Sequence, residues 1–329
     1  MERSEPSRTS STRADGSPTP GGGPLSVRVG VSWTPTGDAL RDGTYRRVVE
    51  ALERIGYDSI WVPDTAALDG VAPLPALTAA ALWTERLKLG TSVLVLPPRS
   101  PVLLARELAT LDVLSSGRLL PAGGLGIAAG PERDALGVPR GERVARLEEV
   151  VMVVKALWSG EPVTYHGRWC TLDGTVLAPR PHRRRIELWL GGTARPALER
   201  VGRIADGWLG SFIGPDAFAD AVDVIRGAAA AAGRTIDPDH YGTTVHAVRS
   251  PRELRADHRR LLDLAPGVAP GDHVATGTAE LRDLLGRFVA SGATKFVVVP
   301  VADDPVAWLE ELFVDVVAPL EAAGGAGPR

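Results

Sequence analysis

A carboxylate ends one of the most apolar stretches of the chain. Residues 59–65 read SIWVPDT, so a strand-like run stops at Asp64 and a small hydroxyl residue, Thr65, follows. An acid at such a point either carries chemistry or meets water. Thr65 cannot serve as an acid or a base near pH 7, because an alcohol lacks a suitable pKa.

Two glycine-containing turns could bring a ligand close to the backbone. Gly191, Gly192 and Thr193 end a strand-like run and open a helix-like one. Glycines permit close approach, and a hydroxyl with free N–H groups at a helix start suits a phosphate. A second turn offers similar access through Gly123, Gly124 and Gly126. Each turn on its own is also compatible with a plain structural turn, which is the commoner case for a glycine pair between a strand and a helix.

His246 is the histidine best placed to move protons, because it lies near the end of the seventh strand-like run. A histidine satisfied at the rim of the fold is an equally good interpretation. The histidines lack metal-ligand spacing such as H-x-x-x-H, so we predict no metal site. The single cysteine, Cys170, excludes a disulfide framework within the chain and a four-thiolate metal centre.

Composition narrows the class of protein. The chain has 329 residues with 37 Lys+Arg and 40 Asp+Glu, a net charge of −3, so we expect neither nucleic acid nor a membrane as a partner. The first 24 residues are rich in Ser, Pro, Gly and Arg and lack the apolar core of a secretion signal. We expect residues 1–24 to be a disordered tail, residues 25–329 to form one domain, and the protein to be cytoplasmic.

Strand-like and helix-like segments alternate eight times after the tail. The expected strands are 27–33, 59–64, 88–97, 118–126, 186–192, 207–212, 241–248 and 295–300. The expected helices are 44–57, 75–87, 101–117, 142–158, 195–205, 216–232, 278–292 and 305–323. This rhythm predicts an α/β fold, a (β/α)8 TIM barrel with an insertion (159–184) after the fourth helix. The alternative is an open doubly wound sheet, but G-x-G-x-x-G is absent after the first strand.

Three stretches, 90–118, 117–126 and 189–208, together resemble the luciferase-like family of flavin- and deazaflavin-dependent oxidoreductases. The resemblance covers about residues 27–325, and its most specific part has TSVL, PVLLA and LATLDVLSSGR in order within 90–118. It implies a (β/α)8 barrel with a flavin or deazaflavin ring in the barrel mouth.

The resemblance also implies roles for individual residues. Family members have a non-proline cis peptide after the third strand that supports one face of the ring, and the matching pair here is Ser92-Val93. The turn at 123–126 would face the ring, and the segment 191–193 would hold the phosphate region of the cofactor. Asp64 fits a cofactor ligand or a polar anchor at the mouth. We take Asp64 and His246 as the candidate catalytic groups.

Two positions depart from the deazaflavin-dependent sugar dehydrogenases of this family. Their second strand ends in Asp-His, whereas this chain has Asp64-Thr65. They carry a Glu after the glycine turn of strand four, whereas this chain has Ile127. Two proton-handling groups are therefore missing, which argues against a sugar phosphate as the substrate.

These features predict an oxidoreductase that transfers a hydride between coenzyme F420 and a small organic substrate that the sequence does not name. F420 is favoured because the branch with GVP at 137–139 and a short insertion is mostly assigned to it. The alternatives are a monooxygenase that uses reduced FMN and O2, and a flavin-binding protein without catalysis. Dimers are common among similar proteins, so a homodimer is an open expectation.

Overall fold

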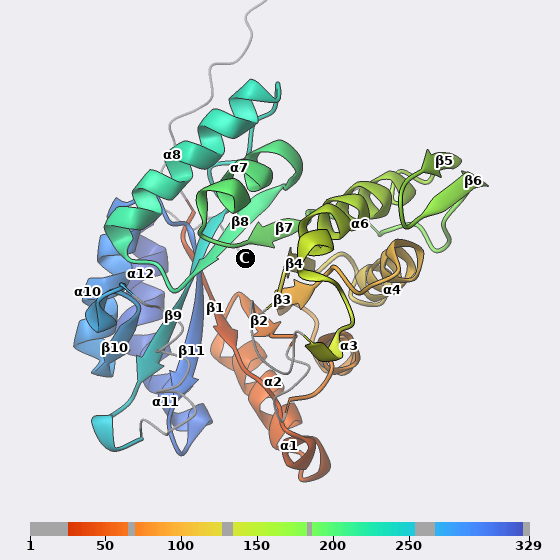
Figure 1. Ribbon diagram of the computed structural model, residues 1–329. Coiled ribbons are helices and arrows are strands. Elements are labelled where there is room, and N and C mark those ends of the chain that lie inside the picture. Colours follow the sequence, from red (N-terminus) through yellow and green to blue (C-terminus); the bar gives the residue numbers. More distant parts are fainter. Residues whose placement is uncertain (1–25, 65–69, 127–133, 183–185, 254–266, 325–329) are drawn as a thin grey trace, which may run out of the picture.

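The parallel strands close into a ring. The computed structural model describes residues 26–64, 70–126, 134–182, 186–253 and 267–324. Around the barrel the order is β1-β2-β3-β4-β7-β8-β9-β11, and β11 pairs with β1 to close it (Figure 1). The bounds are β1 Arg28–Ser32, β2 Ser59–Val62, β3 Lys88–Val95, β4 Leu119–Gly124, β7 Trp189–Gly191, β8 Gly207–Ser211, β9 Tyr241–Val248 and β11 Lys295–Val301. The prediction of a (β/α)8 barrel is confirmed.

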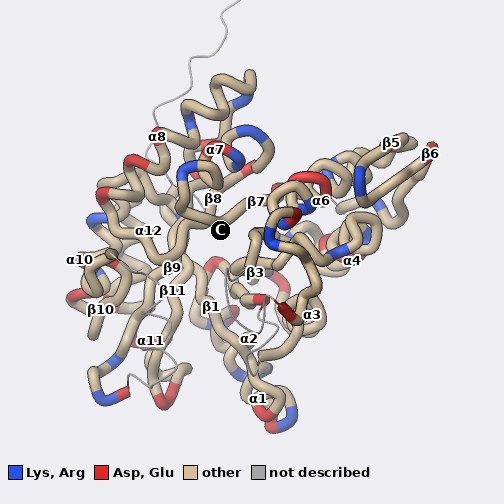
Figure 2. The backbone as a smooth tube through the Cα atoms, viewed as in Figure 1, with Lys and Arg blue, Asp and Glu red and all other residues tan. Residues whose placement is uncertain are grey.

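Helices follow the strands and cover the outside of the ring. They are α1 Gly37–Arg41, α2 Thr44–Ile55, α3 Pro73–Trp83, α4 Pro101–Leu114, α6 Arg143–Leu157, α7 Arg195–Ile204, α8 Pro215–Ala231, α10 Gly277–Ala290, α11 Pro305–Leu312 and α12 Ala318–Ala323. A π-helical turn, Phe313–Val317, joins the last two. Prolines occupy the first turn of several of these helices, where the missing N–H has no intrahelical partner to lose. Charged residues of both signs are scattered over the helices (Figure 2), in keeping with the small net charge.

The insertion after the fourth barrel helix is an antiparallel hairpin of β5 (Val163–His166) and β6 (Thr171–Thr175). The buried carboxylate of Glu149 on α6 accepts hydrogen bonds from the backbone N–H groups of Arg168 (3.0 Å) and Trp169 (2.9 Å). The hairpin therefore packs on α6 at the outside of the barrel, away from the central strands (Figure 1). The predicted insertion is confirmed.

Two apolar cores hold the fold together. The larger one lies between strands and helices, and the smaller one fills the barrel interior with Trp61, Ala122, Trp189, Leu209 and Val297. Glycines make room for the indole rings: a Cβ at Gly90 would lie 2.2 Å from Trp61. Residues that alternate with the helix-facing positions point inward, as the period of a strand requires.

A short strand that the sequence did not predict completes one side of the mouth. β10 (Val274–Thr276) pairs with β9, with Val274 opposite His246 and Thr276 opposite Val248. β10 lies just beyond the point where β8 stops pairing with β9, at Ser211 and Thr244. One edge of β9 therefore pairs first with β8 and then with β10, so the backbone groups along this edge of β9 have hydrogen-bond partners.

No helix within the described ranges is long and apolar enough to span a membrane.

Candidate functional site

The cis peptide bond is the clearest feature at the carboxyl ends of the strands, where barrels carry their sites. The Ser92-Val93 bond is cis, as predicted from the resemblance. The pairing of β3 with β4 shifts register between Ser92 and Leu94. Val93 consequently joins the packing of the barrel interior instead of facing the helices.

Val93 lies over two glycines of the nearby strands β4 and β7. We call the surface formed by Val93, Gly124 and Gly191 the shelf. A Cβ at Gly124 would be 2.7 Å from Val93 Cγ2, and a Cβ at Gly191 would be 3.2 Å from Val93 Cγ1. Real side chains do not fit at those separations without displacing Val93. The two glycines, on β4 and β7 at one side of β3, thus make room for the Val93 side chain.

The other two predicted glycines of the second turn have different surroundings. A Cβ at Gly123 would meet Leu96 at 2.4 Å, so this glycine allows close packing on the helix-facing side. Gly126 has a φ of 72°, which few residues with side chains adopt. Their proposed contacts with a cofactor stay predictions.

Hydroxyl groups from three further strands lie on the inward side of the barrel near the mouth. Ser32 Oγ lies 3.3 Å from Ser92 Oγ, and Ser211 Oγ donates to Thr244 Oγ1 at 3.1 Å. The sequence analysis did not single out Ser32, Ser211 or Thr244. Ser32 and Ser211 end β1 and β8, and Thr244 lies opposite Ser211 on β9; their inward places in the strand alternation are the pattern that could have identified them.

Asp64 anchors the segment that follows the cis peptide. Its Oδ2 accepts a hydrogen bond from Val95 N–H at 3.0 Å and forms an ion pair with Arg99 Nη2 at 2.7 Å. Arg99 Nε in turn donates to Val95 O at 3.0 Å. The pair therefore holds both polar groups of the Val95 backbone. This contact fits the predicted polar anchor, while a catalytic role of Asp64 stays a prediction.

The segment 191–193 meets the start of α7. Gly192 has a φ of 110°, and its carbonyl accepts a hydrogen bond from Trp208 Nε1 at 2.9 Å. No side chain caps the N-terminus of α7, where Ala194 is the N-cap residue. Backbone N–H groups there, with the exposed Thr193, could bind an anionic group.

His246 is buried on the inward side of β9, beside an aromatic ring. The ring of Phe212, whose φ is 56°, stacks on it with centroids 6.1 Å apart. Phe212 also touches His273 edge-on at 6.3 Å, and His246 N–H donates to His273 O at 2.9 Å. Burial lowers the pKa of His273, which keeps that ring neutral near pH 7. Phe212 lies at the end of an expected strand, whereas His273 was not predicted from the sequence.

Thr65 and Ile127, which replace two family residues, lie outside the described residues. Within the described part of the chain, no three His, Cys, Asp or Glu side chains form a group that could hold a metal.

Comparison with known proteins identifies the family. The sequence profile described as luciferase-like monooxygenase matches residues 27–291. An F420-dependent glucose-6-phosphate dehydrogenase of Microbacterium testaceum is 34% identical over 165 residues, 48% of this chain and 49% of that protein. The enzyme of the same name in Nakamurella multipartita is 34% identical over 203 residues, covering 57% and 58%. The chain thus spans about half the length of these curated relatives.

Solved structures share the fold at lower identity. An F420-dependent secondary alcohol dehydrogenase bound to an F420-acetone adduct has a TM-score of 0.75 and 20% identity, covering 89% of this chain and 99% of that one. The oxygenating constituent of 3,6-diketocamphane monooxygenase from Pseudomonas putida, in complex with FMN, has a TM-score of 0.72 and 19% identity, covering 90% and 99%. These similarities show the fold.

Proposed function

The chain belongs to the luciferase-like monooxygenase family, and from that premise we propose that it is an oxidoreductase that transfers a hydride between coenzyme F420 and a small organic substrate. The relatives named as F420-dependent dehydrogenases support an oxidoreductase of this kind. The cofactor, when bound, supplies the hydride chemistry, and the protein supplies its placement.

The shelf around the cis peptide is the observation that carries this proposal. Val93 projects into the mouth, and the positions next to it on β4 and β7 are Gly124 and Gly191. A flat ring needs a low apolar surface, and a side chain at either glycine would push Val93 out of its place. The residues present therefore fit a flavin or deazaflavin ring.

The remaining groups at the mouth have roles that follow from their chemistry. Backbone N–H groups at 192–194, with Thr193, would bind the phosphate of the cofactor. The hydroxyls of Ser32, Ser92, Ser211 and Thr244 would orient polar atoms of the cofactor and substrate. Apolar Val93 and Phe212 would exclude water from the reacting carbon.

We assign His246 the proton transfer that must accompany hydride transfer from an alcohol, or to the corresponding carbonyl compound. It is a titratable group on an inward-facing position near the end of β9. An imidazole can hold or release a proton near neutral pH. His246→Gln should leave F420 binding within about threefold and slow hydride transfer by about 10²–10⁴-fold.

A side-by-side fluorescence titration with F420 and FMN, each oxidised and reduced, tests which cofactor the chain binds. We expect F420 to bind at micromolar concentrations and FMN to bind more weakly. Oxidation of an alcohol panel with absorbance of F420 as the readout then tests hydride transfer.

A monooxygenase that uses reduced FMN is the second candidate, supported by the similarity to an FMN-bound monooxygenase. If the chain binds reduced FMN in preference to F420, and oxygen is consumed when a flavin reductase is present, the monooxygenase replaces the F420-dependent oxidoreductase as the assigned function. Binding without turnover of any substrate would instead indicate a flavin-binding protein without catalysis.

A further inference from the structure

Phe212 has a backbone conformation that bulky residues rarely adopt. It comes directly after β8, and its φ of 56° lies in the left-handed region that favours glycine. Ser116 is the other non-glycine residue with a positive φ in the part of the chain that the structure describes. Ser116 lies in the turn that ends α4, where a left-handed residue is common. A left-handed phenylalanine at the barrel mouth calls for a functional explanation instead.

The left-handed backbone turns the Phe212 side chain to the inside of the barrel. Side chains alternate between the two faces of a strand, and Ser211 points inward, where its Oγ donates to Thr244 Oγ1 at 3.1 Å. If the strand simply continued, Phe212 would point outward to the helices. Its ring instead stacks on His246, which follows Thr244 by two residues on β9 and so lies on the same inward face. The positive φ therefore reverses the alternation at this position.

Two buried imidazoles contact the Phe212 ring from different directions. The His246 ring stacks on it, with centroids 6.1 Å apart and planes inclined by 27°. The His273 ring meets it edge-on, with centroids 6.3 Å apart and planes inclined by 72°. Both arrangements lie within the range of attractive aromatic pairs. The exposed fractions of His246 and His273 are 6% and 2%, so the Phe212 ring packs against side chains with little room to move.

Hydrogen bonds fix the segment that carries His273. Arg287 on α10 donates to Asp272 Oδ1 at 2.6 Å and to Gly271 O at 2.7 Å. His273 follows directly, and its carbonyl accepts a hydrogen bond from His246 N–H at 2.9 Å. The two histidines thus lie on backbone segments that are bonded to each other and to α10. This frame holds Phe212 against His246.

We propose that Phe212 is a positioning residue for the proton transfer assigned to His246. Its ring packs on the imidazole and limits the directions in which the ring nitrogens can point. Proton transfer needs its donor and acceptor at hydrogen-bond distance and in line, so an imidazole that turns freely is less often in the productive geometry. The inference rests on the proposed function, in which His246 gives or takes this proton.

Kinetics of F420 reduction with isopropanol and cyclohexanol as probe alcohols test the role. Phe212→Leu keeps an apolar side chain and loses the ring, so we expect kcat to fall by about 10–100-fold. KM and the Kd of F420 should change less than about threefold. Phe212→Tyr keeps the ring and has room for its hydroxyl at a half-buried position, so it should retain kcat within about threefold. Leucine and tyrosine have the same backbone cost as phenylalanine in the left-handed region, so the variants differ in the ring alone.

A double-mutant cycle separates positioning from direct contact with the substrate. If Phe212 acts through His246, Phe212→Leu should slow single-turnover hydride transfer in the His246→Gln background by less than about twofold, because the group that it positions is gone. Losses that add in the double variant would overturn the proposal, and so would an unchanged kcat in Phe212→Leu.

Nuclear magnetic resonance of the full chain with labelled histidine, without cofactor or substrate, tests the positioning directly. The order parameter of the His246 imidazole should be near about 0.85 in the native chain and in Phe212→Tyr, and below about 0.6 in Phe212→Leu. His246→Gln identifies the resonance. Unchanged order in Phe212→Leu would overturn the proposal. Loss of order, with no alcohol oxidised by the native chain, would support the positioning of His246 and overturn the proposed function instead.

Phe313→Leu is the matched control, because Phe313 is also half-buried and meets an aromatic ring, that of Tyr57, edge-on at 5.3 Å. It lies in the π-helical turn outside the barrel, so it should change neither kcat nor the order of His246. Equal effects of Phe212→Leu and Phe313→Leu on His246 would contradict the proposal. If Phe212→Leu fails to fold, Phe212→Met replaces it in both measurements, because methionine adapts to irregular gaps.

Discussion

At the scale of single residues, Asp64 shows how a contact can separate two roles that the sequence leaves open. The carboxylate binds Val95 N–H and the Arg99 guanidinium, and Arg99 binds Val95 O. Val95 comes two residues after Val93 on the cis peptide. We therefore expect Asp64 to act on the proposed ring site through position rather than through proton transfer.

We therefore expect Asp64→Asn and Arg99→Gln to behave alike. Each should lower the free energy of unfolding by about 1–3 kcal/mol, because each leaves a partly buried partner unpaired. F420 binding should weaken in both, and the double variant should lose less than the sum, with a coupling energy of about 0.5–3 kcal/mol. Urea unfolding and fluorescence titration measure both quantities. If Asp64→Asn alone abolished hydride transfer while the stabilities added, Asp64 would be catalytic instead.

Asp58 is the carboxylic acid residue on which the stability of the folded chain at low pH should depend. Burial opposes its ionisation, but Lys295 and Lys88 outweigh burial and hold the pKa of its carboxyl well below its ordinary range. The folded state therefore binds fewer protons than the unfolded state. The stabilisation is complete above the ordinary Asp pKa of about 3.9 and is lost as the pH falls from there toward the folded-state pKa.

Asp58→Asn should lower the free energy of unfolding at pH 7 by about 3–5 kcal/mol, since it leaves buried Lys295 without its counter-charge. Urea unfolding at a series of pH values should show that the native chain loses this advantage below about pH 4. Asp38→Asn is the control: its exposed pair with Arg41 should contribute less than about 1 kcal/mol. A pH-independent difference between the native chain and Asp58→Asn would contradict the assignment.

At the scale of elements, the sequence predicts strands better than their irregularities. The eight barrel strands follow from apolar runs such as SIWV and KFVVV, which need no tertiary information. β10 has three residues, VAT, too few for a periodic pattern, and its pairing depends on where β8 leaves β9. The inward turn of Phe212 likewise depends on its positive φ, which residue type does not reveal.

The shelf gives a prediction for strand β4. Gly124→Ala places a Cβ only 2.7 Å from Val93 Cγ2, and Val93 is β-branched, so it has few other rotamers. We expect a stability loss of about 1–3 kcal/mol from overpacking and F420 binding weakened by about tenfold or more. Thermal unfolding and fluorescence titration measure these effects.

Gly227→Ala is the matched control on helix α8, where an added Cβ meets no atom within 4 Å. It should raise stability by about 0.5–1 kcal/mol, because alanine loses less backbone entropy in a helix. F420 binding should not change. Unaltered F420 affinity in Gly124→Ala would count against the shelf as the ring site.

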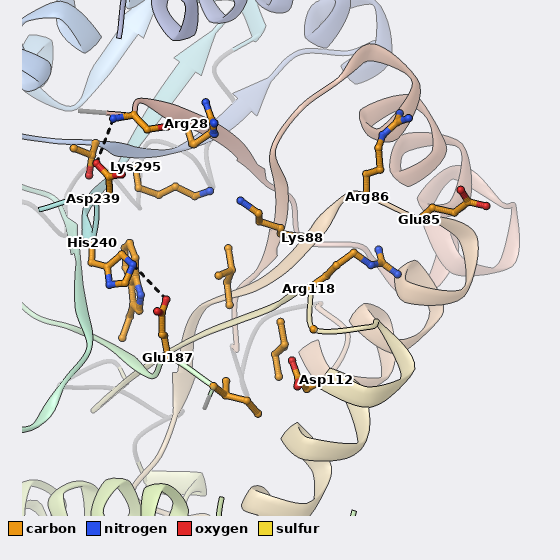
Figure 3. Close-up of a pocket in the computed structure, with 17 residues that line it drawn as sticks. Arg28, Glu85, Arg86, Lys88, Asp112, Arg118, Glu187, Asp239, His240 and Lys295 are labelled. Carbon is orange, nitrogen blue, oxygen red and sulfur yellow. Dashed lines mark hydrogen bonds and ion pairs between the residues drawn. The ribbon is translucent and has the colours of Figure 1, made fainter. Parts of the chain in front are cut away.

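At the scale of the whole molecule, the sequence was sufficient to predict the barrel, but not to predict which side chains meet at its two ends. The eightfold alternation fixes the architecture, and the family resemblance located the cis peptide at Ser92-Val93. A pocket at the amino ends of the strands (Figure 3) is lined by residues from β1, β3, β7 and β11, among them Arg28, Lys88, Trp189 and Lys295, which are far apart in sequence. Such a pocket appears once the ring closes, because closure brings the amino ends of all strands together.

The outside of the barrel carries an unusual apolar surface on α3 and α4, which pack side by side (Figure 1). α3 reads PLPALTAAALW, and a helix that is apolar all round is normally buried. Leu82 is nevertheless 69% exposed, and Leu103 and Leu114 on α4 are 50% and 47% exposed. Exposed apolar side chains on two neighbouring helices are typical of a protein interface.

We expect the chain to form a homodimer through this surface of α3 and α4, since a second copy would offer the same apolar patch. Leu82→Glu combined with Leu114→Glu should weaken the dimer by at least about tenfold, because each would bury an unpaired charge. Sedimentation velocity over a range of concentrations measures this change. Val314→Glu, at a side chain that is 69% exposed in the π-helical turn, is the control and should leave the dimer intact. A native chain that sediments as a monomer, or equal dissociation by the control, would contradict the interface.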